Sequence, residues 1–249
     1  FWIKLIKKIL EDGERFGFKN IGKGKTVNIE FVSANPTGPL HVGHTRGAIF
    51  GDTLASLLKN VGFSVTREYY INDAGTQIES LCRSVYSRYE EALGRKYNAD
   101  NNEYPGDYLK KVGENLVDEF GDSLLSSDIK SNFEKIKTYT LSVMMDQIKK
   151  DLLDLGVIMD NFVSESSLYK NGKVQEAIDH LSKLNLIYKG VLEKPKGSEK
   201  LDWVEREQDL FKSTLFGDDV DRPIKKIDGG WTYFAPDIAY HYDKIKRNY

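Results

Sequence analysis

The chain has 249 residues but a single cysteine, Cys82, and it lacks any run of about 18 apolar residues. One thiol excludes an internal disulfide framework and a zinc site made of cysteine thiolates, so we expect Cys82 to be a buried or half-buried apolar side chain. The formal net charge of −2 excludes a protein that binds nucleic acid with its whole surface, but not a local basic face. Without a long apolar run or a signal peptide, we expect a cytoplasmic protein with no membrane-spanning helix.

Two common phosphate-binding patterns are also missing, because neither G-x-x-x-x-G-K-[ST] nor G-x-G-x-x-G occurs in the chain. The chain has instead the stretch FVSANPTGPLHVGHTRGAIFGD at 31–52. Pro36 and Pro39 cannot donate backbone hydrogen bonds, and each disfavours helix in the residue before it. We therefore expect a rigid turn at 33–39.

The hydrophobic pattern around this turn predicts a βαβ unit. An apolar strand is expected at 26–33, a helix from about 40 to Gly62, and a second strand at 63–71. A turn at 72–75 follows, in which Asn72 or Asp73 is expected to cap a helix that runs to about 93. Strand, glycine-rich turn, helix and strand in this order indicate a parallel sheet in an α/β fold.

The rest of the chain is expected to divide into further segments. A mainly helical middle leads to a third strand at 157–164, and a hairpin at Asp228–Gly230 precedes a last helix. The predicted domains are an N-terminal linker helix at 1–22, the first half of a Rossmann-like catalytic domain at 23–172, a connective insertion at 173–232, and a return to the catalytic domain at 233–249.

The helix start after the turn is predicted to bind an anionic group, phosphate above all, because it offers unpaired backbone N–H groups and a partial positive charge. Gly43 has no β-carbon, so a flat group such as a purine can lie against the backbone. His41 and His44 are three residues apart, and two imidazoles on one helical face can donate hydrogen bonds to a phosphate. The residues alone leave open a two-histidine metal fragment, an ordinary capped helix start, or another kind of phosphate loop.

These residues resemble a known family. HVGH, between a strand and a helix, resembles the H-x-G-H signature of class I aminoacyl-tRNA synthetases, which nucleotidyltransferases share. The wider blocks resemble arginyl-tRNA synthetases of the bacterial type, and they are VNIEFVSANPTGPLHVGHTRGAIFGDTLASLL, YYINDAGTQIE, FVSESSLY, LFGDDVDRP and GGWTYFAPDIAYHYDK. The resemblance implies ATP-dependent activation of L-arginine and its transfer to the 3′ end of tRNA(Arg), on the Rossmann-like fold of class I enzymes.

The resemblance also implies which residues form the site. His41 and His44 match the catalytic signature that steadies the α-phosphate of ATP. The matching ATP-binding positions are Pro39, His41, Gly43 and His44, and the matching arginine-binding positions are Glu30, Ser33, Asn35, Asp73, Tyr233 and Asp237. ATP is then a substrate that carries Mg²⁺, no dedicated metal site is expected, arginine activation needs tRNA, and we expect a monomer.

The residue types in YFAPD agree with recognition of a guanidinium group. A carboxylate such as that of Asp237 can accept two parallel hydrogen bonds from a planar guanidinium, and an aromatic ring such as that of Tyr233 can stack on the guanidinium face. The two residues are four apart, which is one helical turn. Without the family match, Asp237 can also be read as a helix N-cap after Pro236.

The match to the family is incomplete. A Lys-Met-Ser-Lys-Ser-like run is missing, and the nearest run, FKSTLFG at 211–217, lies in another place and lacks the lysine pair. The helical anticodon-binding domain and the small N-terminal tRNA-contacting domain are missing as well. We therefore expect the chain to be a catalytic-domain fragment of a longer synthetase and to be inactive by itself.

Two other functions stay open at this point. A small nucleotidyltransferase uses the same H-x-G-H turn, but it leaves Glu30, Asn35 and the YFAPD block without a role. A non-catalytic piece derived from a synthetase is expected to bind arginine or ATP without turnover. Arginine binding without turnover distinguishes this second function from the ligase.

Overall fold

A computed structural model describes residues 1–96, 104–125, 129–192 and 206–249. The chain divides into two compact units, Phe1–Ser164 and Glu165–Tyr249, and each is described by itself. The part of the predicted insertion at 193–205 lies outside the described residues. The functional division into linker, catalytic half-domains and insertion stays a prediction.

The first unit begins with the amphipathic helix α1 (Trp2–Asp12), followed by the short 3-10 helix η1 (Gly13–Arg15). No residue of α1 is buried, although Trp2, Ile3 and Leu10 are large and apolar. The predicted N-terminal helix is therefore present, and its apolar side chains are exposed.

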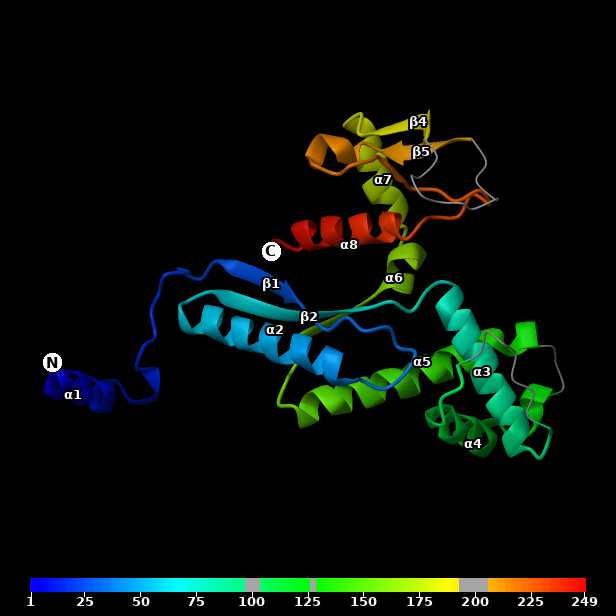
Figure 1. Cartoon of the computed structure of the whole chain (residues 1–249), viewed down its shortest axis with the longest axis horizontal. Coiled ribbons are helices and arrows are strands. Elements are labelled where there is room, and N and C mark those ends of the chain that lie inside the picture. The colour runs from blue at the N-terminus through cyan, green and yellow to red at the C-terminus, as the bar shows by residue number, and fades with distance from the viewer. Residues whose placement is uncertain (97–103, 126–128, 193–205) are drawn as a thin grey trace. The chain divides into compact units, whose positions relative to one another are not determined.

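A three-stranded parallel sheet forms the centre of the first unit (Figure 1), with the order β1 (Thr26–Glu30), β2 (Ser64–Ile71) and β3 (Asn161–Ser164). Helix α2 (Val42–Asn60) is the crossover between β1 and β2. In the register, Thr26 pairs with Ser64 and Glu68 with Asn161. The predicted parallel α/β fold is thus confirmed.

Strand β1 ends three residues earlier than the sequence pattern indicates. Val32 and Ser33 have φ angles of 67° and 41°, which are outside the extended range of a strand. The chain therefore leaves the sheet after Glu30 and enters the turn directly.

Helices α2 and α5 (Ile129–Asp154) pack on one face of this sheet through a buried cluster. Its members come from the turn, from both helices, from β2 and from the segment before β3, and they are Phe31, Ala48, Tyr69, Met145, Ile148, Leu152 and Val157. The bond network of Arg67 joins β2 to α2, because its Nε lies 2.7 Å from Asp52 Oδ1 and its Nη2 lies 3.0 Å from Ser56 Oγ.

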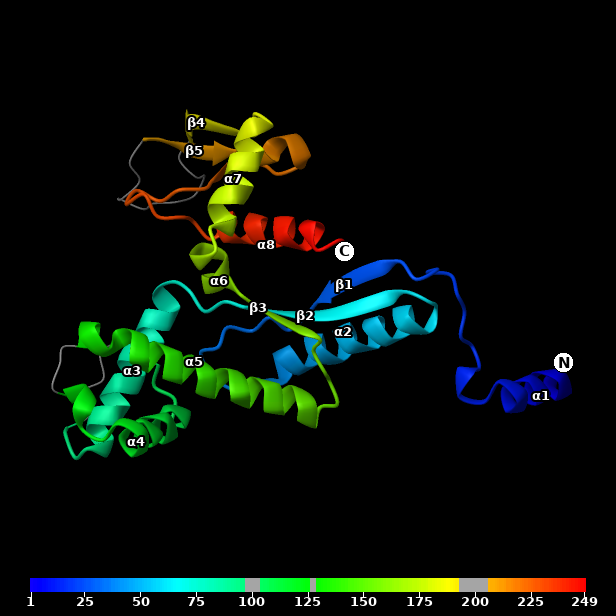
Figure 2. The ribbon, with the colours of Figure 1, turned by 180° about the vertical axis from the view of Figure 1, so that it is seen from behind.

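A second core of the first unit is purely helical (Figure 2). It joins α3 (Thr76–Ala92), α4 (Tyr108–Phe120), the 3-10 helix η2 (Ser123–Leu125) and α5. Its buried members include Leu81, Cys82 and Leu116. The expected burial of Cys82 is confirmed, and burial raises the pKa of this thiol to about 12.

In its described residues, the second unit combines three α-helices with a small antiparallel sheet. The helices are α6 (Glu165–Lys170), α7 (Lys173–Lys183) and α8 (Phe234–Lys246). The strands of the sheet follow the order β4 (Ile187–Val191), β5 (Glu207–Phe211) and β6 (Arg222–Pro223). The 3-10 helix η3 (Ser213–Phe216) lies between β5 and β6 in the chain. The predicted hairpin is present, because Lys225 pairs with Trp231 across Asp228–Gly230.

Ion pairs and a ring contact join α7 to α8 in the second unit. Lys173 pairs with Asp243, Lys246 pairs with Glu176, and the rings of His180 and Tyr242 stack with centroids 4.9 Å apart. No helix within the described ranges is both long and apolar enough to cross a membrane.

Candidate active site

The carboxyl edge of the parallel sheet gathers polar groups from all three strands. Glu30 is the last residue of β1, Asp73 follows β2, and Ser164 is the last residue of β3. The turn from β1 leads into the N-terminus of α2, where the helix dipole carries a partial positive charge. In open α/β sheets this edge is where ligands bind.

His41 and His44 form a reciprocal capping box at the start of α2. The backbone N–H of Gly43 donates to His41 Nδ1 at 3.1 Å, and the backbone N–H of His41 donates to His44 Nδ1 at 3.3 Å. The two rings stack with centroids 3.7 Å apart. The capped-helix interpretation and the phosphate interpretation are thus compatible, because capping fixes both rings at the helix start.

The capping bonds determine which ring nitrogen is left for a ligand. Because both Nδ1 atoms accept hydrogen bonds, each neutral ring carries its proton on Nε2. Burial, and then the neighbouring His41, lowers the pKa of His44. His44 therefore stays neutral near pH 7 and keeps one Nε2–H donor for an anionic group.

Gly43 gives the His41 ring room to fold back over the helix start. A β-carbon at Gly43 would lie 3.0 Å from His41 Cε1 and 3.1 Å from His41 Nδ1, which is tighter than almost all such contacts. This reason for a glycine differs from the predicted one, which was the close approach of a purine. The approach of a purine stays a prediction.

Glu30 and Ser33 are joined to each other and to the central strand. The Ser33 hydroxyl donates to Glu30 Oε1 at 2.9 Å, and the backbone N–H of Tyr70 donates to Ser33 Oγ at 3.1 Å. The left-handed conformation of Ser33 turns its side chain back toward both partners. Glu30 itself is exposed at the end of its strand.

Asn35 and Asp73 also have partners that are distant in the sequence. The Asn35 amide donates to Gln77 Oε1 at 2.7 Å, and the Ser164 hydroxyl donates to Asp73 Oδ2 at 2.7 Å. The expectation that Asn72 or Asp73 caps α3 is wrong, because the N-cap of this helix is Gly75. The buried Asp73 carboxylate thus accepts a hydrogen bond from the last residue of β3.

Tyr233 and Asp237 lie in the second unit, at the start of α8. Tyr233 is the N-cap residue and is 72% exposed, and Asp237 is exposed in the first turn. The reading of Asp237 as the N-cap is therefore wrong, while the expected spacing of one helical turn is confirmed. Burial, then Glu165 and then Asp237 raise the pKa of Tyr169 to about 12, so these two carboxylates and the phenol of α6 are neighbours.

Several partners of the predicted residues carry no signal in the sequence. Gln77, Ser164 and Tyr108 touch the site region across 42, 91 and 71 residues of chain. Tyr169 does have a local signal, because it follows Glu165 by one helical turn and its hydroxyl lies 3.4 Å from Glu165 Oε1. Within the described parts of the chain, no group of three or more His, Cys, Asp or Glu side chains could hold a metal ion.

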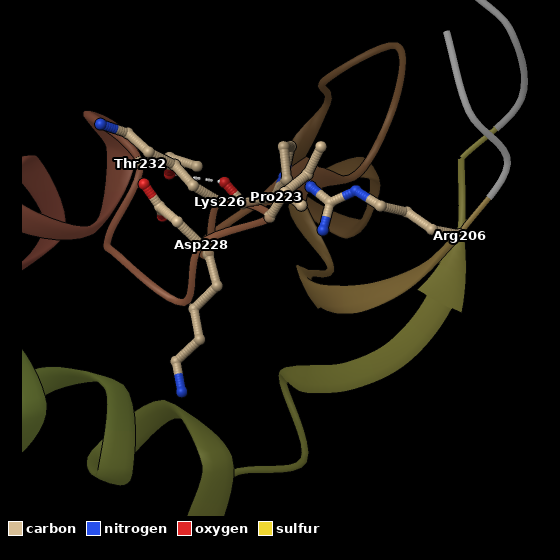
Figure 3. Close-up of a pocket in the computed structure, with 7 residues that line it drawn as sticks. Arg206, Pro223, Lys226, Asp228 and Thr232 are labelled. Carbon is tan, nitrogen blue, oxygen red and sulfur yellow. Dashed lines mark hydrogen bonds between the residues drawn. The ribbon is translucent and has the colours of Figure 1, made fainter.

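A pocket of about 490 Å³ opens in the second unit beside the hairpin (Figure 3). The Arg206 side chain extends toward Pro223, and Lys225, Lys226 and Asp228 also line the pocket. The pocket shares no residue with the predicted arginine or ATP sites, so it contributes nothing to their assignment.

Comparison with known proteins matches this arrangement to one family. The model for the catalytic domain of class I tRNA synthetases (R) matches residues 5–248. A protein from Roseobacter denitrificans named Arginine--tRNA ligase is 57% identical over 248 residues, and one of the same name from Wolbachia pipientis is 55% identical. Both alignments cover 100% of this chain, and the chain spans 43% of the length of these curated relatives.

Solved structures agree with the sequence comparison. A structure described as an arginyl-tRNA synthetase from Campylobacter jejuni superposes with a TM-score of 0.82 at 32% identity, covering 99% of this chain and 50% of that one. The arginyl-tRNA synthetase of Thermus thermophilus, at 19% identity and a TM-score of 0.55, shares the fold over 88% of this chain and 35% of its own. The chain therefore belongs to the arginyl family of class I aminoacyl-tRNA synthetase catalytic domains.

Proposed function

We propose that the protein containing this chain is an arginine–tRNA ligase. It activates L-arginine with ATP to arginyl-adenylate and transfers the arginyl group to the 3′ end of tRNA(Arg). The observation that supports this most is the His41–His44 capping box, which holds two imidazoles at the start of the helix that follows β1 of a parallel sheet. The curated relatives of the chain carry the matching name.

Activation requires little acid–base chemistry. The arginine carboxylate attacks the α-phosphorus of ATP, and pyrophosphate leaves with the electron pair of the broken P–O bond. Negative charge grows on the phosphate oxygens in the transition state, where fixed N–H donors stabilise it most. The Nε2–H groups of His41 and His44, together with the α2 N-terminus, are suited to this role. Pro39 and Gly43 complete the proposed ATP-binding surface.

The arginine-binding role is proposed for Glu30, Ser33, Asn35, Asp73, Tyr233 and Asp237. The first four lie at or just beyond the carboxyl edge of the sheet. Tyr233 and Asp237 offer a ring face and a carboxylate, which suit a planar cation with five N–H donors. A lysine side chain cannot form the same fork, so arginine is selected by hydrogen-bond geometry.

The remaining parts of the proposal concern partners and surroundings. Mg²⁺ enters with ATP and bridges phosphate oxygens, which needs no all-protein cage. The partner is tRNA(Arg), present before arginine activation. We also propose that the protein works in the cytoplasm and is a monomer. Light scattering on the purified full protein measures its molar mass and so tests the oligomeric state.

Arginine-dependent ATP–pyrophosphate exchange tests the proposal on the full protein, with and without tRNA. The test variant is Asp237→Asn, which keeps the shape of the side chain but loses the charge that a guanidinium requires. The control is Asp219→Asn, an exposed carboxylate in the same unit. We expect exchange in the wild type and in the control, and a loss of about 100-fold or more with Asp237→Asn, chiefly in kcat/KM for arginine.

Two results would contradict the ligase. Absence of arginine-dependent exchange, combined with a rise in melting temperature on adding arginine, would indicate a protein that binds without turnover. Exchange that requires no amino acid would indicate a different nucleotidyl transfer.

A further inference from the structure

Tyr108, the first residue of α4, contacts the turn that leads to the histidine pair. Its hydroxyl donates a hydrogen bond to the backbone carbonyl of Thr37. Its ring lies against Gly38, where an added β-carbon would lie 3.2 Å from the hydroxyl oxygen and 3.3 Å from Cζ. The missing side chain at Gly38 therefore leaves the room that this contact needs.

The contact lies at the rim of a small pocket. Pro39 and Tyr108 line this pocket of about 220 Å³ together with Val112 of α4 and Met144 of α5. Since a pocket occupies this space, Pro39 is not packed tightly against the helices there. The hydroxyl bond is thus a localised attachment of the turn and not one contact within a broad apolar surface.

Two other side chains hold the same turn on its strand side. The Tyr69 hydroxyl donates to the Ala34 carbonyl at 2.8 Å, and Asn35 is bonded to Gln77 of α3. Tyr108 acts two residues further along, between these attachments and His41. The helical layer thus contacts the turn where the chain passes from the proposed arginine-binding residues to the proposed ATP-binding residues.

We propose that Tyr108 is a positioning residue for arginine activation, because its hydroxyl fixes the Thr37 carbonyl and so sets the path of the turn to the His41–His44 pair. This rests on the proposed function. Burial, followed by Tyr104, raises the pKa of Tyr108, so the phenol stays protonated and able to donate at any working pH. Tyr108 touches neither substrate in this role and acts through the turn.

The test compares Tyr108→Phe with Tyr89→Phe in the full protein. Both changes remove only a hydroxyl that donates to a backbone carbonyl, since Tyr89 donates to Gly121 at 2.7 Å within the same helical core. For Tyr108→Phe we expect kcat of arginine-dependent exchange to fall about 3- to 10-fold, which corresponds to one neutral hydrogen bond. KM for arginine and ATP should change less than about 2-fold, because no substrate contact is lost. Tyr89→Phe should lower the melting temperature similarly and leave kcat unchanged.

Amide hydrogen exchange over 34–45 supplies a readout that does not depend on activity. We expect faster exchange in Tyr108→Phe and wild-type exchange in Tyr89→Phe. Unchanged amide exchange in Tyr108→Phe overturns the positioning role, and so does a kcat equal to that of Tyr89→Phe. A wild-type protein without arginine-dependent exchange contradicts the proposed function instead, while the amide measurement still decides whether Tyr108 fixes the turn.

Discussion

Two histidines at the start of α2 combine a structural and a proposed chemical role in one arrangement. Each ring uses Nδ1 to accept a backbone N–H of its own helix start. The rings stack on each other, which leaves little rotational freedom to either one. A fixed N–H donor costs no reorganisation when charge develops, so the capping box suits the catalytic role proposed for Nε2.

His44→Ala is predicted to slow arginine-dependent ATP–pyrophosphate exchange about 10²–10³-fold, through the loss of one transition-state donor. The loss of a partner for the His41 backbone N–H should add about 1 kcal/mol of destabilisation. Exchange kinetics and urea unfolding of the full protein measure the two effects separately.

His180→Ala is the matched control, because this histidine also stacks on an aromatic ring, that of Tyr242 in the second unit. It lies in the last turn of α7 and has no part in the proposed site. It should keep wild-type kcat. If His44→Ala also keeps more than about one-tenth of the wild-type rate, the histidine is a helix cap without a catalytic role.

At the scale of elements, the β1–α2–β2 unit is stabilised by apolar packing and by a polar network, both between α2 and the sheet. Ala48 and Ala55 are fully buried in α2, and small side chains let this helix approach the sheet closely. Arg67 of β2 then reaches Asp52 and Ser56 on the same helix. Its side chain is only 15% exposed, so this pair is screened less than a surface pair.

Arg67→Ala is predicted to destabilise the first unit by about 1–3 kcal/mol, because it leaves Asp52 half-buried without its cation and removes the bond to Ser56. Arg67→Lys should recover only part of the loss, since an ammonium cannot form the same fork. Urea unfolding with unchanged m-values measures these differences.

The contrasting variant is Lys150→Ala, which breaks an exposed pair with Asp154 on α5. The two side chains are 66% and 63% exposed, so we expect little measurable loss of stability. Equal losses for Arg67→Ala and Lys150→Ala would show that the Arg67 network adds no more than a surface ion pair.

At the scale of the whole molecule, the chain has two compact units with separate cores. Leu81 and Leu210 are fully buried, the first in the helical core of the first unit and the second in β5 of the second unit. Proteins with more than one cooperative unit commonly depart from two-state unfolding.

Calorimetry of the 249-residue chain is therefore predicted to show two thermal transitions. Leu81→Ala should lower the midpoint temperature of one transition, and Leu210→Ala that of the other. Each change leaves a cavity that destabilises its own unit by about 2–5 kcal/mol. A single transition that both variants lower equally would show instead that the units unfold as one.

The sequence alone determined the elements whose signals are local. Apolar periodicity predicted β2 and α2, and two prolines with a glycine predicted the turn between β1 and α2, because these signals act within a few residues. The HVGH stretch together with the wider blocks around it and further along the chain was sufficient to indicate the family. The end of β1 was missed by three residues, because apolar side chains at 31 and 32 read as strand while their burial belongs to the turn.

The tertiary structure decided which partner each polar side chain takes. Nothing near Asp73 in the sequence shows that it binds Ser164 rather than capping α3, and nothing near Thr37 points to Tyr108. Such contacts form only when strands and helices from separate parts of the chain pack together, so their donors and acceptors cannot be paired by local pattern. The sequence predicted which residue types form the candidate site, and the packing of the sheet against the helices decided which partners hold them in place.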